Sequence, residues 1–223
     1  FTVTHESHKF EVLGQLSEVL PETNSKVITE PKAKNTLPAI ALATYDIYKK
    51  DKDAVVGVFA SDHSIKNEEK FLSAWKSAEA IAQDDFLALI GIKPGGPATG
   101  YGYIKPNKKI NKKADLDIYE VESFIEKPNK NDAIKYVDDG YLWNSGMFVF
   151  KAKIFMDLLK KYQLEIYNSL FKISDNNLEE IYASFPSISM DYGLAEKVKK
   201  IAVVPVGMGW NDLGSWNSIY ENG

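Results

Sequence analysis

The sequence predicts an α/β protein whose largely parallel sheet carries helices on both faces. Apolar runs of strand length at 54–60 (AVVGVFA) and 86–92 (FLALIGI) suit strands that are buried on both sides. Segments with helical spacing of apolar residues alternate with the strands up to residue 92. Because such alternation is typical of β-α-β units, it favours a parallel arrangement of the strands.

The elements of this first part are expected in the following order. Strands are predicted at 1–4, 26–30, 54–60 and 86–92. The helices between them are expected to begin after Thr4, at Pro38 and after Asn67, because Thr and Asn cap helices and a first turn tolerates proline. The first helix carries an apolar stripe at Phe10, Leu13, Leu16 and Leu20.

The pattern becomes less regular after residue 92. Further strands are predicted at 118–126, 147–150 and 201–206, and a short helix at 131–137. The lysine-rich stretch 105–113 is expected to be a solvated loop. We interpret the chain as one domain, 1–223, with a mostly helical insert at about 151–199.

Composition and charge exclude several classes of protein. Hydrophobic residues make up 44% and charged residues 26%, which is ordinary for a folded chain. The net charge of −4 argues against a broad nucleic-acid interface. Cysteine is absent, which excludes disulfides and thiolate metal sites, and no apolar run approaches the length of a membrane span. We therefore expect a cytoplasmic protein without nucleic-acid or membrane partners.

The first candidate motif is Ser61-Asp62-His63, which follows the strand predicted at 54–60. Ligands of open α/β sheets bind outside the carboxyl ends of strands, and a carboxylate placed there can hold a divalent cation near phosphate oxygens. The alternative is that Asp62 serves as a turn or cap residue, and the residues alone do not decide between the two. The three histidines, His5, His8 and His63, do not have the spacing of a zinc site.

Other motifs carry polar groups in suggestive places, and each has a structural alternative as a turn or an aromatic corner. They are Pro94–Tyr103, Glu126-Lys127, Trp143-Asn144-Ser145-Gly146 and Trp210-Asn211-Asp212. Glycine lets backbone amides approach a ligand, glutamate and asparagine bind hydroxyls, and lysine binds phosphate. Because Glu126 and Lys127 are successive residues at a strand end, their side chains are expected to point apart rather than to pair.

Taken in order, these motifs resemble one family, the sugar-1-phosphate nucleotidylyltransferases, and within it the mannose-1-phosphate guanylyltransferases. The matching blocks are 30–43, 59–65, 91–104, 124–128, 141–150, 187–197 and 209–216. The resemblance implies a Rossmann-like mixed, mostly parallel sheet. It also implies that GTP and mannose 1-phosphate react, with Mg²⁺, to give GDP-mannose and pyrophosphate.

The resemblance also assigns roles to residues. It implies that Asp62 and Asp212 are the magnesium carboxylates, and that Lys127 is the cation for the sugar phosphate. The implied catalytic residues are thus Asp62, Lys127 and Asp212. The implied substrate-binding residues are Gly102, Glu126, Asn144 and Asp191. The implied nucleotide-binding residues are Asn35, Thr36 and Asp62.

The sequence departs from the family in two places. Lys34 stands where the family usually has arginine, and lysine lacks the planar fork for a paired contact. The family's glycine-rich signature loop and its first strand do not occur, so we expect upstream residues in the native protein and little catalysis by this chain alone. A non-catalytic sugar-nucleotide-binding regulatory relative and an enzyme for another hexose 1-phosphate stay open as alternatives. The oligomeric state is also open, with a homodimer as one option.

Overall fold

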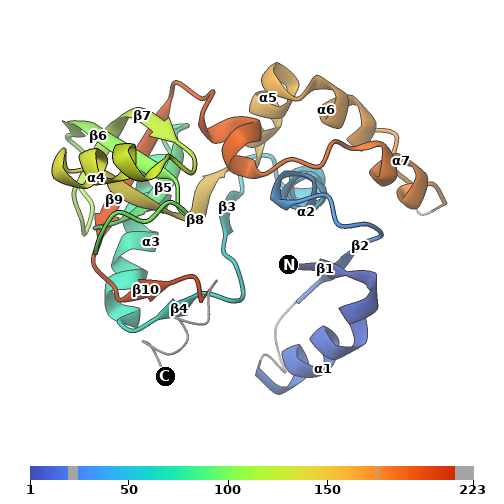
Figure 1. Ribbon diagram of the computed structural model, residues 1–223. Coiled ribbons are helices and arrows are strands. Elements are labelled where there is room, and N and C mark those ends of the chain that lie inside the picture. Colours follow the sequence, from blue (N-terminus) through green and yellow to red (C-terminus); the bar gives the residue numbers. More distant parts are fainter. Residues whose placement is uncertain (20–24, 175, 214–223) are drawn as a thin grey trace.

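The computed structural model describes residues 1–19, 25–174 and 176–213, and its centre is a six-stranded sheet (Figure 1). The strands lie in the order β3-β8-β5-β9-β7-β6. Their bounds are β3 Val55–Val58, β8 Leu142–Lys151, β5 Leu87–Ile92, β9 Ile201–Val206, β7 Ile118–Ile125 and β6 Tyr103–Ile110. Two small sheets accompany it, β1 (Thr2–His5) with β2 (Val27–Glu30), and β4 (Ser64–Ile65) with β10 (Trp210–Asn211).

The central sheet contains both parallel and antiparallel pairs of neighbouring strands. β3, β5, β9 and β6 run one way, and β7 and β8 run the other way. Because β8 lies between β3 and β5, neighbours are mostly antiparallel, and β5 and β9 form the parallel pair. The strands of the first β-α-β series are therefore divided between two sheets, since β1 and β2 pair separately.

Helices cover both faces of this sheet, as the sequence predicts. Side chains of β5 alternate between the faces. Ala88 and Ile90 face α3 (Glu68–Ala82), whereas Leu87 and Leu89 face the side of α2 (Thr36–Lys50) and α5 (Ala152–Tyr162). All six residues of β5 are buried, which confirms the doubly covered strand predicted at 86–92. Asn67 caps α3 as expected, accepting a hydrogen bond from the backbone N–H of Lys70.

The segment between β8 and β9 is largely helical, as the sequence predicts. It contains α5, α6 (Leu164–Leu170), α7 (Leu178–Ser184) and a π-helical turn at Asp191–Ala195. Its status as an insert stays a prediction. The remaining helices are α4 (Lys130–Asp138) and, near the N-terminus, a 3-10 turn at Glu6–His8 with α1 (Lys9–Val19). Within the described ranges, no helix has the length and apolar character needed to cross a bilayer.

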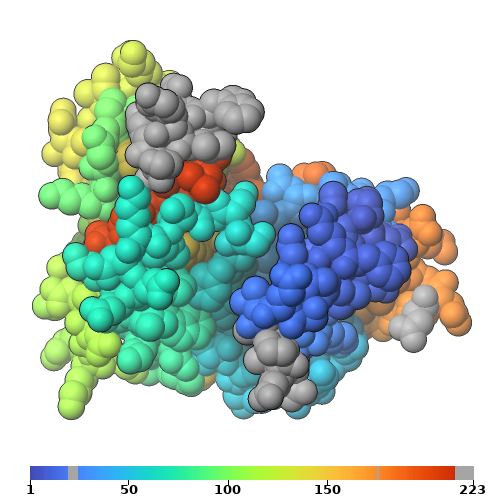
Figure 2. Space-filling view, turned by 90° about the horizontal axis from the view of Figure 1, so that it is seen from below, coloured from blue at the N-terminus to red at the C-terminus, as the bar shows by residue number. Residues whose placement is uncertain are grey.

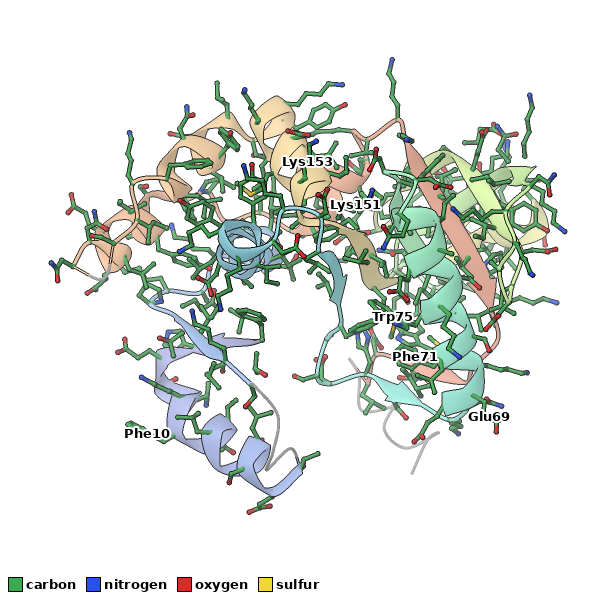
Figure 3. All side chains as sticks on the ribbon, turned by 180° about the vertical axis from the view of Figure 1, so that it is seen from behind. Phe10, Glu69, Phe71, Trp75, Lys151 and Lys153 are labelled. Atoms are coloured by element: carbon green, nitrogen blue, oxygen red, sulfur yellow. The ribbon has the colours of Figure 1, made fainter. Side chains whose placement is uncertain are left out.

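The unit β1-α1-β2 differs from the rest of the molecule. Helix α1 has no buried residue, and Phe10 is 84% exposed, so the predicted apolar stripe is not covered by the described residues. Figure 3 shows Phe10 pointing away from the body of the molecule, and Figure 2 shows this unit in blue, on the side opposite β6, β7 and α4. Leu20 lies outside the described residues. The predicted cap at Thr4 is wrong, because Thr4 lies in β1 and His5 accepts the capping hydrogen bond from Ser7.

Two other predictions are corrected by the structure. Strand β3 is only half-buried, because among the described residues it pairs with β8 alone and lies at the edge of the sheet. The stretch 105–113 is not a loop throughout, since β6 continues to Ile110. Lys105 forms an ion pair with Glu122 of β7, and Lys109 forms one with Asp117, the residue directly before β7. These pairs support a strand in spite of a poor composition for one.

Candidate active site

The predicted site residues gather beyond one edge of the central sheet. Strands β3, β5 and β9 run in the same direction, so their carboxyl ends face this edge. The segments that follow them carry Asp62, Gly102 and Asp212. In open α/β sheets this is the edge at which ligands bind. The structure arranges seven of the nine predicted site residues in two neighbouring groups, whereas Asn35 and Thr36 lie at the start of α2.

The inner cluster consists of Gly102, Glu126, Lys127, Asn144 and Asp191. Asn144, at the start of β8, connects it: its side-chain amide donates to Asp191 Oδ1 at 2.8 Å, and its backbone N–H donates to the Gly102 carbonyl at 2.8 Å. Glu126 lies directly against Gly102, since a Cβ on Gly102 would be only 2.4 Å from Glu126 Oε2. The structure therefore brings together all four residues implied for sugar binding, with Lys127 beside them.

Burial makes the carboxyl groups of the inner cluster unusual. The Glu126 side chain is 9% exposed, and burial, with the negative charge of Asp191 as a smaller cause, raises its pKa to about 7. Burial also raises the pKa of Asp191, which the hydrogen bond from Asn144 opposes. Glu126 Oε2 is buried without a hydrogen-bond partner in the described structure. A buried acceptor without a donor is a site where a ligand hydroxyl gains a strong hydrogen bond.

Lys127 corrects one expectation from the sequence. Its Nζ lies 3.6 Å from Glu126 Oε1, although successive residues in a strand should point apart. The reason is that β7 ends at Ile125 and Lys127 adopts φ +48°, so the backbone turns and brings the ammonium group back. The Lys127 side chain is 59% exposed and can reach a charged group outside the cluster. A non-glycine residue in this region of backbone space is typical of binding sites.

The outer cluster consists of Asp62, His63, Tyr101, Trp210 and Asp212. It is built on the antiparallel ribbon of β4 and β10, in which Trp210 is paired with Ile65 and Asn211 with Ser64. One step further along the same register, Asp212 comes opposite His63, with Asp62 next in the chain. The ribbon is what brings together two aspartates that lie far apart in the sequence.

Aromatic rings hold the outer cluster. The Tyr101 hydroxyl donates to Asp212 Oδ1 at 2.9 Å, and the Tyr101 ring packs edge-on against Trp143 and Trp210, with centroids 5.0 and 5.4 Å apart. Burial, together with Asp212, raises the pKa of Tyr101 to about 12, so the hydroxyl keeps its proton as a donor. Phe59, which precedes Asp62, packs against Phe71 and Trp75 of α3, and Figure 3 shows both of these rings on the side of α3 toward β3.

Both aspartates act electrostatically on one imidazole, that of His63. Burial lowers the pKa of His63, and the charges of Asp62 and Asp212 both oppose this shift. His63 also borders the inner cluster, because a Cβ on Gly146 of β8 would lie 3.9 Å from His63 Cε1. The two clusters are therefore neighbours. Trp210 also forms an aromatic corner with His63 and Tyr101, which is the structural alternative for the motif at 210–212.

The donor set fits a magnesium site that substrate completes. Within residues 1–19, 25–174 and 176–213, no group of three or more His, Asp or Glu side chains could hold a metal ion alone. Mg²⁺ characteristically uses one or two carboxylates, several waters and phosphate oxygens of a substrate. Asp62 is exposed and Asp212 half-exposed, so both are accessible to such an ion.

The residues implied for nucleotide binding lie at the start of α2. Asn35, with φ +66°, caps this helix by accepting a hydrogen bond from Thr36 N–H at 2.8 Å. The Thr36 hydroxyl oxygen accepts from Met190 N–H at 2.8 Å, directly before Asp191, and so links α2 to the inner cluster. Lys34, in the place of the family's arginine, donates to the Ala183 carbonyl at 2.7 Å. A contact of these residues with nucleotide stays a prediction.

Three residues of the outer cluster, His63, Tyr101 and Trp210, were not predicted as site residues from the sequence; Trp210 adjoins the motif residue Asp212 through Asn211. Tyr101 lies in the glycine-rich motif, of which only Gly102 was selected, and His63 adjoins Asp62. The position of Tyr101 between two glycines was the one feature of the sequence that could have indicated this residue. A pocket of about 450 Å³ is lined by Lys93, Tyr141 and Val206, among other residues. None of its lining residues belongs to either cluster.

Comparisons with known proteins agree with this arrangement. A family model described as nucleotidyl transferase matches residues 1–223. A mannose-1-phosphate guanylyltransferase of Escherichia coli K12 is 38% identical over 231 residues, covering 98% of this chain and 48% of that protein. The xanthan biosynthesis protein XanB of Xanthomonas campestris pv. campestris (strain B100) is also 38% identical, with the same coverage. The chain spans about half the length of these curated relatives.

Solved structures show the same fold. A protein of Thermus thermophilus, described as a mannose-1-phosphate geranyltransferase, superposes with a TM-score of 0.86 at 26% identity, covering 98% of this chain and 62% of that one. A Helicobacter pylori protein, described as a mannose-6-phosphate isomerase, gives 0.81 at 30% identity, with 94% and 82% covered. These likenesses confirm the predicted α/β class.

Proposed function

Because the chain belongs to the nucleotidyl transferase family, we propose that the native protein joins GTP and mannose 1-phosphate into GDP-mannose and releases pyrophosphate. The curated relatives named mannose-1-phosphate guanylyltransferase, among them one at 38% identity, support these substrates. The observation that carries the proposal is the β4–β10 ribbon, which places Asp62 and Asp212 around His63 and beside the inner cluster.

The inner cluster is proposed to bind the sugar phosphate. Glu126 and Asn144 accept and donate hydrogen bonds to hexose hydroxyls, and Asp191 holds the Asn144 amide in position. The close approach of Gly102 to Glu126 leaves the Gly102 backbone facing the sugar. Lys127, whose ammonium group is largely exposed, is the point charge for the phosphate. Burial of Glu126 and Asn144 strengthens their contacts with hydroxyls, because little water competes there.

The outer cluster is proposed to hold Mg²⁺ through Asp62 and Asp212. When bound, the ion supplies charge neutralisation of the triphosphate and of the departing pyrophosphate. Tyr101 keeps one oxygen of Asp212 engaged, which fixes the direction of the other. In the reaction an oxygen of mannose 1-phosphate forms a bond to the α-phosphorus, and the bond from that phosphorus to pyrophosphate breaks. The protein contributes mainly alignment and electrostatic stabilisation.

The proposal keeps Asn35, Thr36 and Asp62 as contacts of the nucleotide. Thr36 accepts a hydrogen bond from Met190 but can still donate its own hydroxyl proton to a ligand. The cytoplasmic setting remains an expectation, and a homodimer is one assembly to test. A binding-only regulatory relative would not need two carboxylates placed beside a sugar-type cluster, so the arrangement favours catalysis.

Pyrophosphate release by the native protein that carries this chain tests the proposal. GTP with mannose 1-phosphate and Mg²⁺ should give turnover, and other triphosphates or hexose phosphates should give much less. Asp62→Asn and Asp212→Asn should each lower kcat by about 10³-fold, since losing cation stabilisation removes several kcal/mol. Asp157→Asn, an exposed residue of α5, is the control. Full rates in both aspartate variants would contradict the proposal that Asp62 and Asp212 hold Mg²⁺. Turnover of other substrates alone would contradict the proposal that GTP and mannose 1-phosphate are the substrates.

A further inference from the structure

The tautomer of His63 follows from its contact with Trp210. The indole Nε1 of Trp210 lies 3.2 Å from His63 Nδ1 and is the donor of this hydrogen bond. An indole N–H can only donate, so Nδ1 must be the acceptor and carries no proton. An imidazolium, with a proton on both nitrogens, could not accept this bond. The ring is therefore neutral, with its proton on Nε2.

The group that sets this tautomer is itself held in place. Trp210 is 9% exposed and belongs to β10, which pairs with β4 directly after His63. The rings of His63 and Trp210 are perpendicular, at 88°, with their centroids 5.3 Å apart. The ring of Tyr101 also packs against Trp210. The imidazole is thus oriented before any ligand arrives, which lowers the entropy that binding must overcome.

The Nε2–H group lies at the junction of the two clusters. In imidazole the carbon Cε1 separates the two nitrogens, and in His63 this carbon faces Gly146, whose N–H donates to Asn144 Oδ1 at 3.2 Å. Asp62 and Asp212 both act electrostatically on the ring. Among the described residues, nothing accepts a hydrogen bond from Nε2. The Nε2–H donor, for which the described residues supply no acceptor, therefore lies close to the inner cluster and within the electrostatic influence of Asp62 and Asp212.

We propose that His63 binds a phosphate oxygen through Nε2–H, at the position where the phosphoryl group passes between triphosphate and sugar phosphate. This inference rests on the proposed function. No covalent step is involved, and the proton stays on Nε2 throughout. A neutral donor suits this place, because it stabilises developing negative charge on oxygen in a fixed direction. Trp210 is then a positioning residue that acts through His63.

A matched pair of variants separates this role from simple packing. The amide nitrogen of glutamine reaches the position of Nε2, whereas that of asparagine, one methylene shorter, reaches the position of Nδ1. His63→Gln should keep kcat/KM within about fivefold of the native protein, and His63→Asn should lower it by roughly 10²-fold, the usual effect of losing one such donor. Equal losses in the two variants would show that His63 only packs, and would overturn the inference.

Nitrogen-15 NMR of the native, histidine-labelled protein gives a readout that needs neither a variant nor activity. The His63 spectrum should show an unprotonated Nδ1 and a protonated Nε2, and inorganic pyrophosphate should shift the Nε2–H signal. Trp210→Phe should give a mixture of both tautomers. A proton on Nδ1 in the native protein, or no response to pyrophosphate, would overturn the inference.

The two readouts also distinguish failure of this inference from failure of the proposed function. If pyrophosphate shifts Nε2–H but GDP-mannose is never made, the phosphate site stands and the substrate assignment fails. If GDP-mannose is made while His63→Asn keeps the full rate, the substrate assignment stands and the role of His63 fails.

Discussion

The inner and outer clusters each contain two acidic side chains, but they present them in opposite surroundings. Glu126 and Asp191 lie where burial raises the pKa of both, next to a strand of the central sheet. Asp62 is exposed, and Asp212 is held by an aromatic hydroxyl on a short ribbon. A buried carboxyl group can bind a ligand hydroxyl with little competition from water, whereas an accessible carboxylate can be reached by a hydrated cation. We therefore propose two different functions for acidic side chains, according to their position.

The largest effect within the inner cluster is expected from adding a methyl group at Gly102, where the neighbouring side chains leave no room for it. In Gly102→Ala the new Cβ would lie 2.4 Å from Glu126 Oε2 and 3.3 Å from Asn144 Cβ, so both side chains must move. We expect kcat/KM for mannose 1-phosphate to fall by about 10²-fold. The free energy of unfolding should fall by roughly 1–3 kcal/mol.

Gly100→Ala is the matched control for this prediction, because a Cβ there meets no atom within 4 Å. Steady-state kinetics and urea unfolding of both variants provide the measurements. Similar kinetics in the two variants would mean that the inner cluster does not bind the sugar.

A second effect concerns the pH dependence of stability. The pKa of Glu126 is about 7 in the folded protein and ordinarily 4.5, and Asp191, Lys127 and Glu196 are the charged groups that act on it. Between these values the folded state binds more protons than the unfolded state, so the contribution of Glu126 to stability falls as pH rises through this range. In Glu126→Gln this loss should disappear.

Urea unfolding at pH 5 and pH 8 measures the difference. Between pH 5 and pH 8, the free energy of unfolding of the native protein should fall by roughly 1–2 kcal/mol more than that of Glu126→Gln. This is less than the whole pKa shift corresponds to, because the carboxyl group retains some contact with solvent. Glu122→Gln, which removes an exposed carboxylate from β7, the strand that precedes Glu126, is the control for the change in charge. An identical pH dependence of Glu126→Gln and native protein would contradict the low-dielectric character of the inner cluster.

The smallest effect is expected on cation binding by the outer cluster, because contact with solvent weakens the hydrogen bond between Tyr101 and Asp212. Tyr101→Phe removes only the hydroxyl that donates to Asp212, so the affinity for Mn²⁺, measured by electron paramagnetic resonance, should fall about five- to tenfold. Tyr103→Phe removes a hydroxyl that donates to the Ala98 carbonyl instead, and should leave Mn²⁺ affinity unchanged. If both variants bind Mn²⁺ as the native protein does, Tyr101 does not position Asp212.

Local patterns in the sequence predicted most elements of the fold. Apolar runs located β5, and Asn67 was correctly predicted as a helix cap, because burial and capping depend on neighbouring residues. The burial of β3 was wrong, since it depends on which strands pair with it. The strand through Lys105 and Lys109 was missed, since its cross-strand ion pairs need partners that the local sequence does not show.

The site could be predicted only in part, for a related reason. Each motif could be located at a strand end, but Trp210 and His63 are 147 positions apart, and periodicity carries no information about such a contact. Resemblance to a family supplied the pairing of Asp62 with Asp212. The Glu126–Lys127 ion pair could not be foreseen, because it depends on the positive φ of Lys127.

The β4–β10 ribbon also sets the time at which the proposed cation site is formed during synthesis. His63 leaves the ribosome 147 residues before Trp210, and at about 5–20 residues per second this delay is on the order of 7–30 s. During that interval the nascent chain holds Asp62 without its partner. A growing polypeptide therefore lacks the complete proposed cation site until β10 has been translated.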